Sequence, residues 1–440
     1  MPQETLEKFF EKLERENKEN NFKQTEIGLI PEDWEVVRLG DIIVYKKGKK
    51  PRMLSDKWEY GFLPYLTAEF FRTGKPDKFV NVRKEAGIEI VNPDDVVLIW
   101  DGSKAGDTFT GLKGVLASTM IKIDVRNEYK VSKKLIYYFL KTKFDILNTK
   151  TTGSTIPHVS KTVFENLPVP LPPLSEQRKI VRVLDKIQQA IELQDRIIEQ
   201  AERLKKSLMQ KLFTEGLYGE EQKETEIGLI PKSWEVVKLG EVTNIKTSTS
   251  SPTLIKEYIT SRPTNSEIAK ILYLKVADLN LPINTTYIIE SKEIIYAPRE
   301  VIDHFNVVPP FSIIFPKRGG AISTNKKRIT RFYSLIDPNL AAVTPSKAIN
   351  IIFLYYWFIT FDLLTITDRS PIPQLNKKDI EQIRIPLPPL EEQKQIAHIL
   401  STIDKKIEIE QKRKQVLKAL FKTMLHKLMS GEIRLKEVEI

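Results

Sequence analysis

The sequence predicts a protein of mixed α/β (α+β) class, in which two similar domains are separated by two long antiparallel coiled-coil helices. Three observations support this prediction. Two boundary motifs each occur twice in the same order, the segments between them contain short strand-like apolar runs, and a long helical pattern follows each segment. Because a long-range repeat duplicates a whole structural unit, we expect an internal tandem repeat with pseudo-twofold symmetry.

The two boundary motifs define the repeat. TEIGLIP covers residues 25–31 and returns at 225–231, and each copy continues into Trp-Glu-Val-Val. PLPPLSEQ at 170–177 returns as PLPPLEEQ at 386–393. These motifs predict an N-terminal helical segment, a first domain, a first spacer helix, a second domain, and a second spacer helix with a tail: 1–24, 25–170, 171–218, 219–386 and 387–440.

Short apolar runs inside each domain predict strands, because they are bounded by Gly, Pro and Asp. Examples are residues 96–99 and 120–123 in the first domain, and 271–274 and 312–315 in the second. The longest apolar run, 351–361, has about half of the roughly 20 residues that a membrane span requires. We therefore expect a buried helix there and no membrane association.

The two spacer helices are predicted by an uninterrupted pattern. Gly and Pro are absent from 174–215 and 390–430, and Gly216 and Gly431 suit helix ends. Each helix of roughly 40 residues would be about 60 Å long. Their apolar residues step alternately by four and three, which indicates a coiled-coil seam. The seam residues are Ile180, Leu184, Ile187, Ile191, Ile198 and Leu208, and then Ile396, Leu400, Ile403, Ile407, Leu417 and Phe421.

A second apolar row widens the stripe on each helix beyond what a two-helix seam requires. Its members are Val183, Leu193, Ile197 and Leu204 in the first helix, and Ile399, Ile409 and Leu420 in the second. This row could contact partner helices or pack against the chain's own domains. The sequence leaves both alternatives open.

Composition limits the chemistry of the chain. It has 440 residues, no Cys and four His, which excludes disulfides, thiolate zinc sites and Cys nucleophiles. The N-terminal residues are charged and show no signal-peptide core, so we expect a cytoplasmic protein. Most of the net charge of +11 lies in residues 25–170 and 225–386, which carry +4 and +5. This distribution favours a polyanionic partner.

Common catalytic motifs are missing. The chain contains no phosphate-binding loop, and the Pro-Pro-aromatic element at 308–311 lacks the Asn or Asp of adenine methyltransferases. Asp94 and Asp101 lack the Lys that a nuclease would place two residues further on, and the histidines show no metal-ligand spacing. We therefore expect a non-catalytic protein with no metal and no cofactor of its own.

Basic loops are the remaining candidates for function. Lys and Arg neutralise phosphates, and Arg, Asn or Gln on adjacent loops read base edges, so these loops could bind double-stranded DNA. They could equally be solvated charged loops, and the loop 100–104 could face a DNA groove or hold a packed Trp. The candidate residues are Lys46, Lys47, Lys49, Lys50, Arg52 and Lys104 in the first domain, and Lys317, Arg318, Lys326, Lys327, Arg328 and Arg331 in the second.

The order of motifs resembles the specificity subunit of type I restriction-modification systems. Each repeat opens with TEIGLIPxxWEVVxLG, has a Ser-x-Ile-Pro stretch near its end (154–157 and 370–373), and continues from PLPPLxEQ into a long helix. The resemblance covers residues 25 to about 435. One departure is that Gly153 of the first repeat corresponds to Arg369 in the second, which puts the turn there in doubt.

This resemblance implies a division of roles. The two domains would be target recognition domains, each reading one half of a bipartite, asymmetric DNA target. The helices would set the gap and dock two modification (methyltransferase) subunits. Those subunits and the restriction (translocase and nuclease) subunits would hold S-adenosylmethionine, ATP and Mg. Two rival interpretations are a specificity factor of another phage-defence or orphan adenine-methylation system, and a coiled-coil scaffold that binds no DNA.

Overall fold

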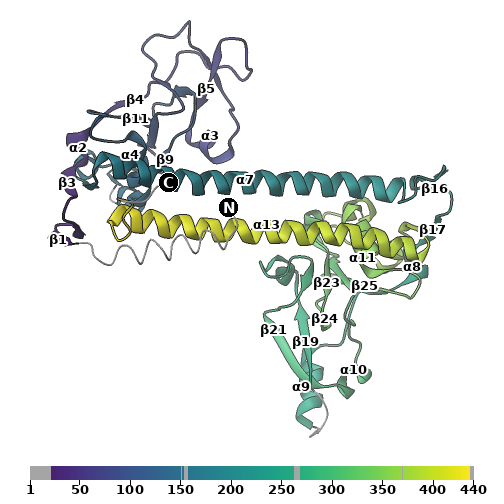
Figure 1. Cartoon of the computed structure of the whole chain (residues 1–440). Helices are drawn as coiled ribbons and strands as arrows, with labels where there is room; N and C mark the ends of the chain where they lie inside the picture. The colour runs from purple at the N-terminus through teal and green to yellow at the C-terminus, as the bar shows by residue number, and fades with distance from the viewer. Residues whose placement is uncertain (1–20, 150, 153–156, 262–267, 369, 437–440) are drawn as a thin grey trace. The chain divides into compact units, whose positions relative to one another are not determined.

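The chain folds into two compact units, which the computed structural model describes for residues 21–149, 151–152, 157–261, 268–368 and 370–436 (Figure 1). Unit 1 comprises Met1–Asp195 and Lys412–Ile440, and unit 2 comprises Arg196–Gln411. Each unit therefore contains one mixed α/β domain together with part of both long helices. Similar element orders in the two units reflect the tandem repeat.

Unit 1 contains two four-stranded sheets and three strand pairs. The first sheet, in spatial order, is β4 (Ile43–Lys47), β11 (Met120–Val125), β8 (Val96–Ile99) and β9 (Thr108–Phe109). The second is β6 (Phe79–Asn81), β5 (Phe62–Leu66), β10 (Gly114–Leu116) and β7 (Ile90–Val91). The pairs are β1 (Phe22–Thr25) with β2 (Gly28–Pro31), β3 (Glu35–Arg38) with β14 (Pro168–Leu171), and β12 (Thr151–Thr152) with β13 (His158–Val159).

Unit 1 also contains shorter helices. They are α2 (Leu39–Ile42), α3 (Ala68–Thr73), α4 (Lys133–Thr142), α5 (Phe144–Thr149) and α6 (Lys161–Glu165). Residues 135–140 are the buried residues of α4 and pack in one core with Ile180 and Leu184. The domain and the long helix therefore share a core. Tyr138 fixes this contact because its hydroxyl donates to Asp185 Oδ1 at 2.6 Å.

Unit 2 contains a five-stranded and a three-stranded sheet. The first is β18 (Thr243–Lys246), β25 (Leu340–Pro345), β22 (Ile313–Pro316), β23 (Arg328–Thr330) and β20 (Tyr287–Ile288). The second is β21 (Glu293–Pro298), β19 (Ile268–Leu274) and β24 (Tyr333–Ile336). Two pairs repeat those of unit 1: β15 (Gln222–Thr225) with β16 (Gly228–Pro231), and β17 (Glu235–Lys238) with β26 (Arg384–Leu387).

The helices of unit 2 include the predicted apolar one, α11 (Ile351–Thr360), which is largely buried. Tyr356 on α11 donates to Asp404 Oδ2 at 2.6 Å, as Tyr138 does to Asp185 in unit 1. The other short helices are α8 (Leu239–Val242), α9 (Pro252–Ser261), η2 (Val276–Asn280), α10 (Glu300–His304), η3 (Gly319–Thr324), η4 (Leu363–Ile366) and α12 (Lys377–Glu381). None of the helices in the described part of the chain is long and apolar enough to cross a membrane.

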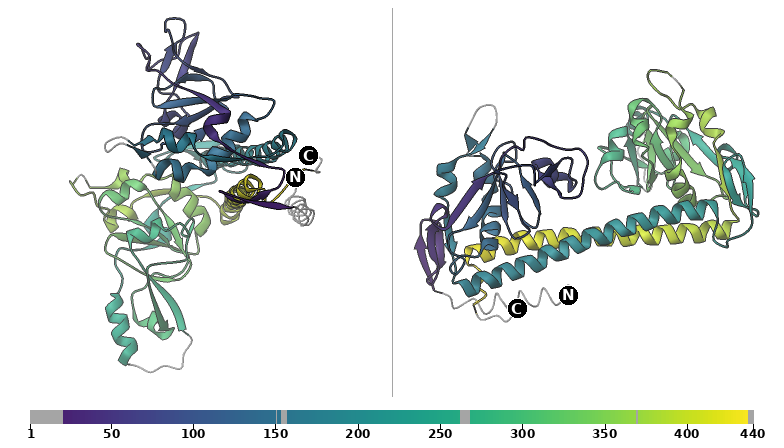
Figure 2. Two further views of the ribbon diagram at one scale, coloured as in Figure 1. Left: turned by 90° about the vertical axis from the view of Figure 1, so that its left-hand side faces the viewer. Right: turned by 90° about the horizontal axis from the view of Figure 1, so that it is seen from above.

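Two helices of 41 residues each, α7 (Leu174–Thr214) and α13 (Leu390–Ser430), follow the Pro-Pro pairs. Each ends next to a glycine with positive φ, which is +66° at Gly216 and +76° at Gly431. In unit 1 the start of α7 lies beside the end of α13, where Lys179 Nζ donates to the Lys436 carbonyl at 2.9 Å (Figure 2). In unit 2, Lys205 of α7 pairs with Asp404 of α13 at 2.6 Å. Within each unit, the helix segments are therefore antiparallel.

The seam residues lie inside these contacts. Ile180, Leu184, Ile187, Ile191, Ile396, Leu400 and Ile407 are buried, and Ile198, Leu208, Ile403, Leu417 and Phe421 are half-buried. The residues of the second apolar row differ in their burial. Val183 is buried in the core of unit 1, whereas Leu193, Leu204 and Ile409 are about half exposed (52%, 54% and 48%). Packing against the chain's own domains therefore explains only part of this row.

The predicted N-terminal helical segment lies almost entirely outside the described residues. Its last residues, from Phe22 onward, belong to β1 rather than to a helix. They pair with β2 because Gly28, at φ +101°, allows the tight turn between the two strands. The two positions that depart from the resemblance, Gly153 and Arg369, also lie outside the described residues.

Candidate nucleic-acid interface

In unit 1, two basic segments that are distant in sequence meet at one end of the first sheet. Lys47, the last residue of β4, pairs with Ile121, and Ile99, the last residue of β8, pairs with Met120. Strands β4 and β8 therefore finish at the same end of the sheet, on either side of β11. We call the residues that leave this end, 46–52 and 100–104, the basic end of unit 1.

All six predicted cations of unit 1 are exposed at this basic end. They are Lys46, Lys47, Lys49, Lys50, Arg52 and Lys104. Gly48 between them is buried, and its amide donates to the Met120 carbonyl at 3.0 Å. A Cβ at Gly48 would lie 2.2 Å from the Ala117 carbonyl oxygen, so only glycine fits this position. The close approach at Gly48 keeps the flanking lysines on the surface.

One acidic residue sits among these cations. Asp101 accepts an ion pair from Lys47 Nζ at 2.8 Å and lies 2.6 Å from His158 Nδ1. The backbones of Asp101 and His158 also form an isolated β-bridge. Lys47 is therefore partly neutralised, and the imidazole of His158, which is 45% exposed, is held in a fixed direction at the basic end.

An aromatic cluster supports the loop that carries Asp101. The ring of Trp100 stacks on Tyr45 at 5.7 Å between centroids and meets the edge of Phe164 at 5.4 Å. The Tyr45 hydroxyl donates to Glu165 Oε1 at 2.9 Å, and burial together with this bond raises the pKa of Tyr45 to about 12. Trp100 is thus a packed residue next to the turn, which agrees with one of the two alternatives for this loop.

Unit 2 repeats this geometry with different side chains. Lys246 at the end of β18 pairs with Ala342, and Pro316 at the end of β22 pairs with Leu340, so both strands again finish at one sheet end. Arg318 forms an isolated β-bridge with Gln374, as Asp101 does with His158. Unit 2 therefore carries Arg and Gln at the positions where unit 1 carries Asp and His.

The two cations that follow β22 have different surroundings. Lys317 is half-buried, its Nζ donates to the Thr247 carbonyl at 3.0 Å, and burial lowers the pKa of Lys317. Arg318 is exposed, and no hydrogen bond or ion pair joins its guanidinium to a described residue. Arg318 is therefore the predicted cation of unit 2 best placed to contact a ligand.

The segment 326–328 is more structural than its sequence suggests. Lys327 is only 2% exposed, and its Nζ donates to Asn325 Oδ1 at 2.7 Å and to the Phe361 carbonyl at 2.6 Å. Burial lowers the pKa of Lys327 to about 7. The prediction that Lys327 contacts DNA is therefore wrong in this fold. Its neighbours are held as well, Lys326 by Asn280 and Arg328 by the Asn284 carbonyl.

Arg331 lies at a different place in unit 2. Its guanidinium stacks on the ring of Tyr287 at 4.2 Å. It also lines a cavity of about 440 Å³ together with Lys270 and Arg299, two cations that the sequence analysis missed. No pattern in the sequence links these three residues, because they come from separate segments that only folding brings together.

His158 and Gln374 were also missed as candidates. A signal for them was present, because each directly follows the repeated Ile-Pro stretch, and the two occupy equivalent places in the repeats. The pairing of this stretch with the loops after β8 and β22 is a tertiary feature. In the described part of the chain no group of three or more His, Asp or Glu residues could hold a metal ion.

A family model, the type I restriction modification DNA specificity domain, matches residues 31–203 and 231–419. The MjaVIII type I restriction enzyme specificity subunit of Methanocaldococcus jannaschii is 36% identical over 431 residues, covering 96% of this chain and 98% of that protein. The EcoDI type I restriction enzyme specificity subunit of Escherichia coli is 23% identical over 401 residues, covering 84% and 81% of the two chains. Both matches extend over most of the tandem repeat.

Solved structures share the fold. The S subunit of a type I restriction-modification system from M. genitalium aligns with a TM-score of 0.56 at 17% identity, covering 90% of this chain and 96% of that one. A chain from a structural study of complex assembly and conformational transition in a type I system aligns with a TM-score of 0.52 at 18% identity, covering 92% and 99%.

Proposed function

The chain belongs to the specificity subunits of type I restriction-modification systems, and from this premise we propose that its two units read the two unlike halves of a split DNA target. Members of this family are non-catalytic DNA-recognition subunits, and they assemble with other subunits of the system and with DNA.

The observation that carries the proposal is the substitution at one equivalent place in the two units. Unit 1 presents His158 beside an Asp101–Lys47 pair, and unit 2 presents Arg318 beside Gln374. Arg contacts guanine O6 and N7, and Gln contacts adenine N6 and N7, whereas a His ring next to a carboxylate offers a different set of hydrogen-bonding groups. The two units have similar folds but different side chains at the positions proposed to contact bases. We therefore expect a DNA target that is bipartite and non-palindromic.

The surrounding lysines suit contacts to the DNA backbone. Exposed Lys46, Lys49, Lys50 and Arg52 leave the same sheet end as the reader positions. Cations of this kind bind phosphates without sequence preference and fix the register of the protein on the duplex. We therefore assign affinity to these residues and sequence preference to the positions at the two β-bridges.

The long helices supply a second contact surface. Leu193 and Ile409 occupy equivalent places at an offset of 216 residues, and both are about half exposed. Leu204, eleven residues after Leu193 on α7, and Val416, seven residues after Ile409 on α13, extend these rows and are 54% and 51% exposed. Exposed apolar rows at this spacing suit partner helices. Because each helix carries one row, we infer two modification subunits, with restriction subunits joining through them.

The partner subunits would then carry out the catalytic reactions. We propose that the modification subunits hold S-adenosylmethionine and that ATP and Mg serve the restriction subunits, while this chain binds no cofactor. We also propose that α7 and α13 act as the spacer that sets the gap between the half-sites, because each is a continuous helix of 41 residues.

The test is co-expression with the neighbouring methyltransferase gene in a host without DNA methylation, followed by single-molecule sequencing for modified adenine. The expected result is one split motif with two different halves. A palindromic or uninterrupted motif would contradict the two-reader proposal. A soluble complex that methylates no motif would favour the coiled-coil scaffold without DNA.

A further inference from the structure

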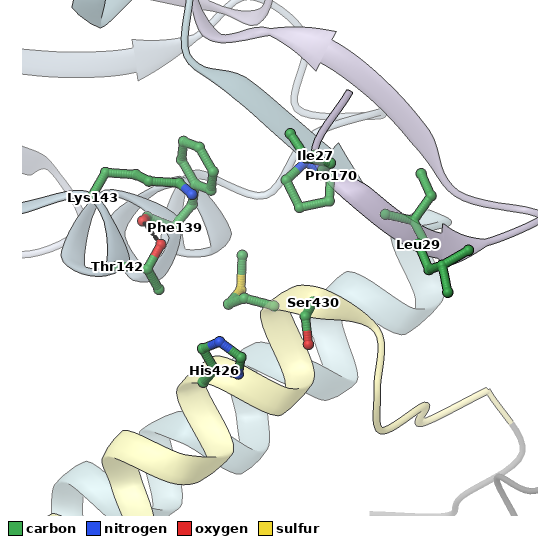
Figure 3. A pocket seen from close by; sticks show the side chains of 10 residues that line it. Ile27, Leu29, Phe139, Thr142, Lys143, Pro170, His426 and Ser430 are labelled. Atoms are coloured by element: carbon green, nitrogen blue, oxygen red, sulfur yellow. Dashed lines mark hydrogen bonds between the residues drawn. The ribbon is translucent and has the colours of Figure 1, made fainter. Parts of the chain in front are cut away.

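Unit 1 has a cavity of about 320 Å³ between the β1–β2 hairpin, the end of α4 and the end of α13 (Figure 3). Its apolar lining includes Ile27, Leu29 and Phe139, and His426 and Ser430 lie on the α13 side. Lys143 extends over Phe139, with its Nζ 5.3 Å from the ring centroid. No Asp or Glu is among the ten residues that line this cavity.

Unit 2 has a cavity of about 670 Å³ at the equivalent place, lined by Ile227, Leu229, Ile230 and Pro386. These four residues match Ile27, Leu29, Ile30 and Pro170 of the first cavity. The ends of the long helices also correspond, because Ser430 is the last residue of α13 and Thr214 is the last residue of α7. The repeat has therefore preserved a cavity as well as a fold.

The leucine of the repeated motif is not explained by folding. Thr25 and Gly28 form the turn, where Thr25 Oγ1 donates to the Gly28 carbonyl at 2.8 Å, and Ile30 is buried. Leu29, however, is 62% exposed, and its equivalent Leu229 is 54% exposed. An exposed leucine contributes little to folding. Both copies of the motif nevertheless contain this leucine, although the two domains that follow differ in most of their sequence. A binding requirement common to both units accounts for this.

We propose that each cavity receives an apolar side chain from one copy of the same partner, the modification subunit, with Leu29 or Leu229 at the rim of the contact. This inference rests on the proposed function. The same cavity in both units fits a partner that binds twice. Lys143 lines the unit 1 cavity without an acidic neighbour in the lining, whereas both Arg384 and Glu215 line the unit 2 cavity. The inserted segment therefore carries a carboxylate next to its apolar residue, which pairs with Lys143 in unit 1.

The two basic residues differ in how far they are already neutralised. Arg384 forms an ion pair with Glu226 at 3.0 Å. Lys143 makes no ion pair with a described residue, and burial lowers the pKa of Lys143. A partner carboxylate would therefore contribute more in unit 1 than in unit 2, and Lys143→Glu should weaken binding at unit 1 alone.

The test uses the full chain co-expressed with its modification subunit, analysed by native mass spectrometry. The wild-type chain should carry two modification subunits, Leu29→Asp or Leu229→Asp should carry one, and the double variant none under the same conditions. Loss of the leucine contact that the partner would bury should weaken binding of the modification subunit at each site by about tenfold to a hundredfold. Leu254→Asp is the matched control, because Leu254 is 53% exposed but lies on α9 outside the repeated motif.

The outcomes separate this inference from the proposed function. If the double variant still bound two modification subunits, the inference would be overturned and the proposed function would stand. If the wild-type chain bound none, the proposed function itself would fail. If the chain alone formed dimers and Leu29→Asp dissociated them, the occupant of the cavity would be a second copy of the chain. This result would also overturn the inference. Unchanged thermal unfolding of each variant would exclude loss of the fold.

Discussion

At the residue scale, the fold accepts opposite charges at one equivalent position. Asp101 and Arg318 each follow a central strand and each form a backbone bridge to the Ile-Pro stretch. The backbone bond holds the position whatever the side chain is, so the side chain is free to differ between units. Asp101 needs Lys47 and His158 as partners, whereas Arg318 extends into solvent.

Arg318→Ala should relax one base position in the second half-site and leave the first half-site intact. A bidentate Arg contact to guanine contributes about 1–3 kcal/mol of discrimination, which is roughly fivefold to 150-fold in binding. Methylation-motif sequencing and binding to single-base variants of the target would measure the change. Arg203→Ala is a control, because Arg203 is an exposed residue of α7 that pairs with Glu199. Altered preference in the first half-site would contradict this assignment.

Lys327 should make the stability of unit 2 depend on pH. Burial lowers the pKa of Lys327 from 10.5 to about 7, so between these values the unfolded chain binds a proton that the folded unit does not. The free energy of unfolding should therefore rise from about pH 7 to pH 10.5 and be unaffected by this group below pH 7.

Lys327→Met removes this dependence. The melting temperature of wild type minus that of Lys327→Met should be more positive at pH 9.5 than at pH 7. The reason is that the Lys327 contribution to the stability of wild type increases as the pH rises. Lys326→Met serves as a control, since Lys326 is only half-buried. A difference that is equal at both pH values would show that Lys327 keeps its charge in the folded protein up to pH 9.5, and would contradict the lowered pKa.

At the element scale, the end of α13 is fixed to unit 1 by a buried charge network. Arg434 is 6% exposed, and its guanidinium donates to Glu176 at 2.7 and 2.8 Å and to Asp33 at 2.9 Å. Glu176 also accepts from Trp34 Nε1 at 3.1 Å. In unit 2 the equivalent Glu392 accepts from Trp234 Nε1 and from the Leu217 amide. Among the described residues, an arginine takes part in the unit 1 network but not in that of unit 2.

Arg434→Met should destabilise unit 1 by about 3 kcal/mol, because it leaves the carboxylate of Glu176 buried without its cation. Hydrogen exchange should accelerate at β3 and β14 and stay unchanged at β17 and β26 of unit 2. Adding Glu176→Gln should restore part of the protection, since the uncompensated charge is then removed. Equal acceleration in both units would rule out a local role for this network.

At the scale of the whole molecule, each unit combines one domain with part of both long helices. The first residues of α7 and the last residues of α13 belong to unit 1, and the remaining parts belong to unit 2. Two continuous helices therefore link the units, and the cores around Ile180 and Ile396 anchor them. Under the proposed function, the length of these helices sets the gap between the half-sites.

Removing one heptad from both helices, residues 194–200 and 410–416, should shorten the unread gap by about two to three base pairs. Seven residues span about 10 Å, a base pair rises about 3.4 Å, and a whole heptad keeps the seam in register. Sequencing of the methylated motif would show both half-sites unchanged. Removing the heptad from α7 alone is the control and should disrupt the seam. An unchanged gap in the double deletion would contradict the spacer role.

The elements with strong local signals could be predicted from the sequence. The two helices, the strand of residues 96–99 and the buried helix at 351–360 follow from periodicity and from Gly and Pro boundaries. The candidate site was predicted only in part. The exposed candidates include Lys46, Lys47, Lys49, Lys50, Arg52 and Arg318. Lys327 is buried, because a backbone carbonyl and an amide oxygen accept hydrogen bonds from its Nζ inside unit 2.

The sequence by itself determined that the protein is a duplication, that helices follow the two domains, and that no thiol chemistry is possible. These features depend on residue order and local spacing. The tertiary structure decided which distant residues meet: Asp101 with His158, Arg318 with Gln374, and the repeated leucines with the ends of α7 and α13. These contacts depend on strand register and on packing between segments more than a hundred residues apart in some cases, which local spacing does not encode.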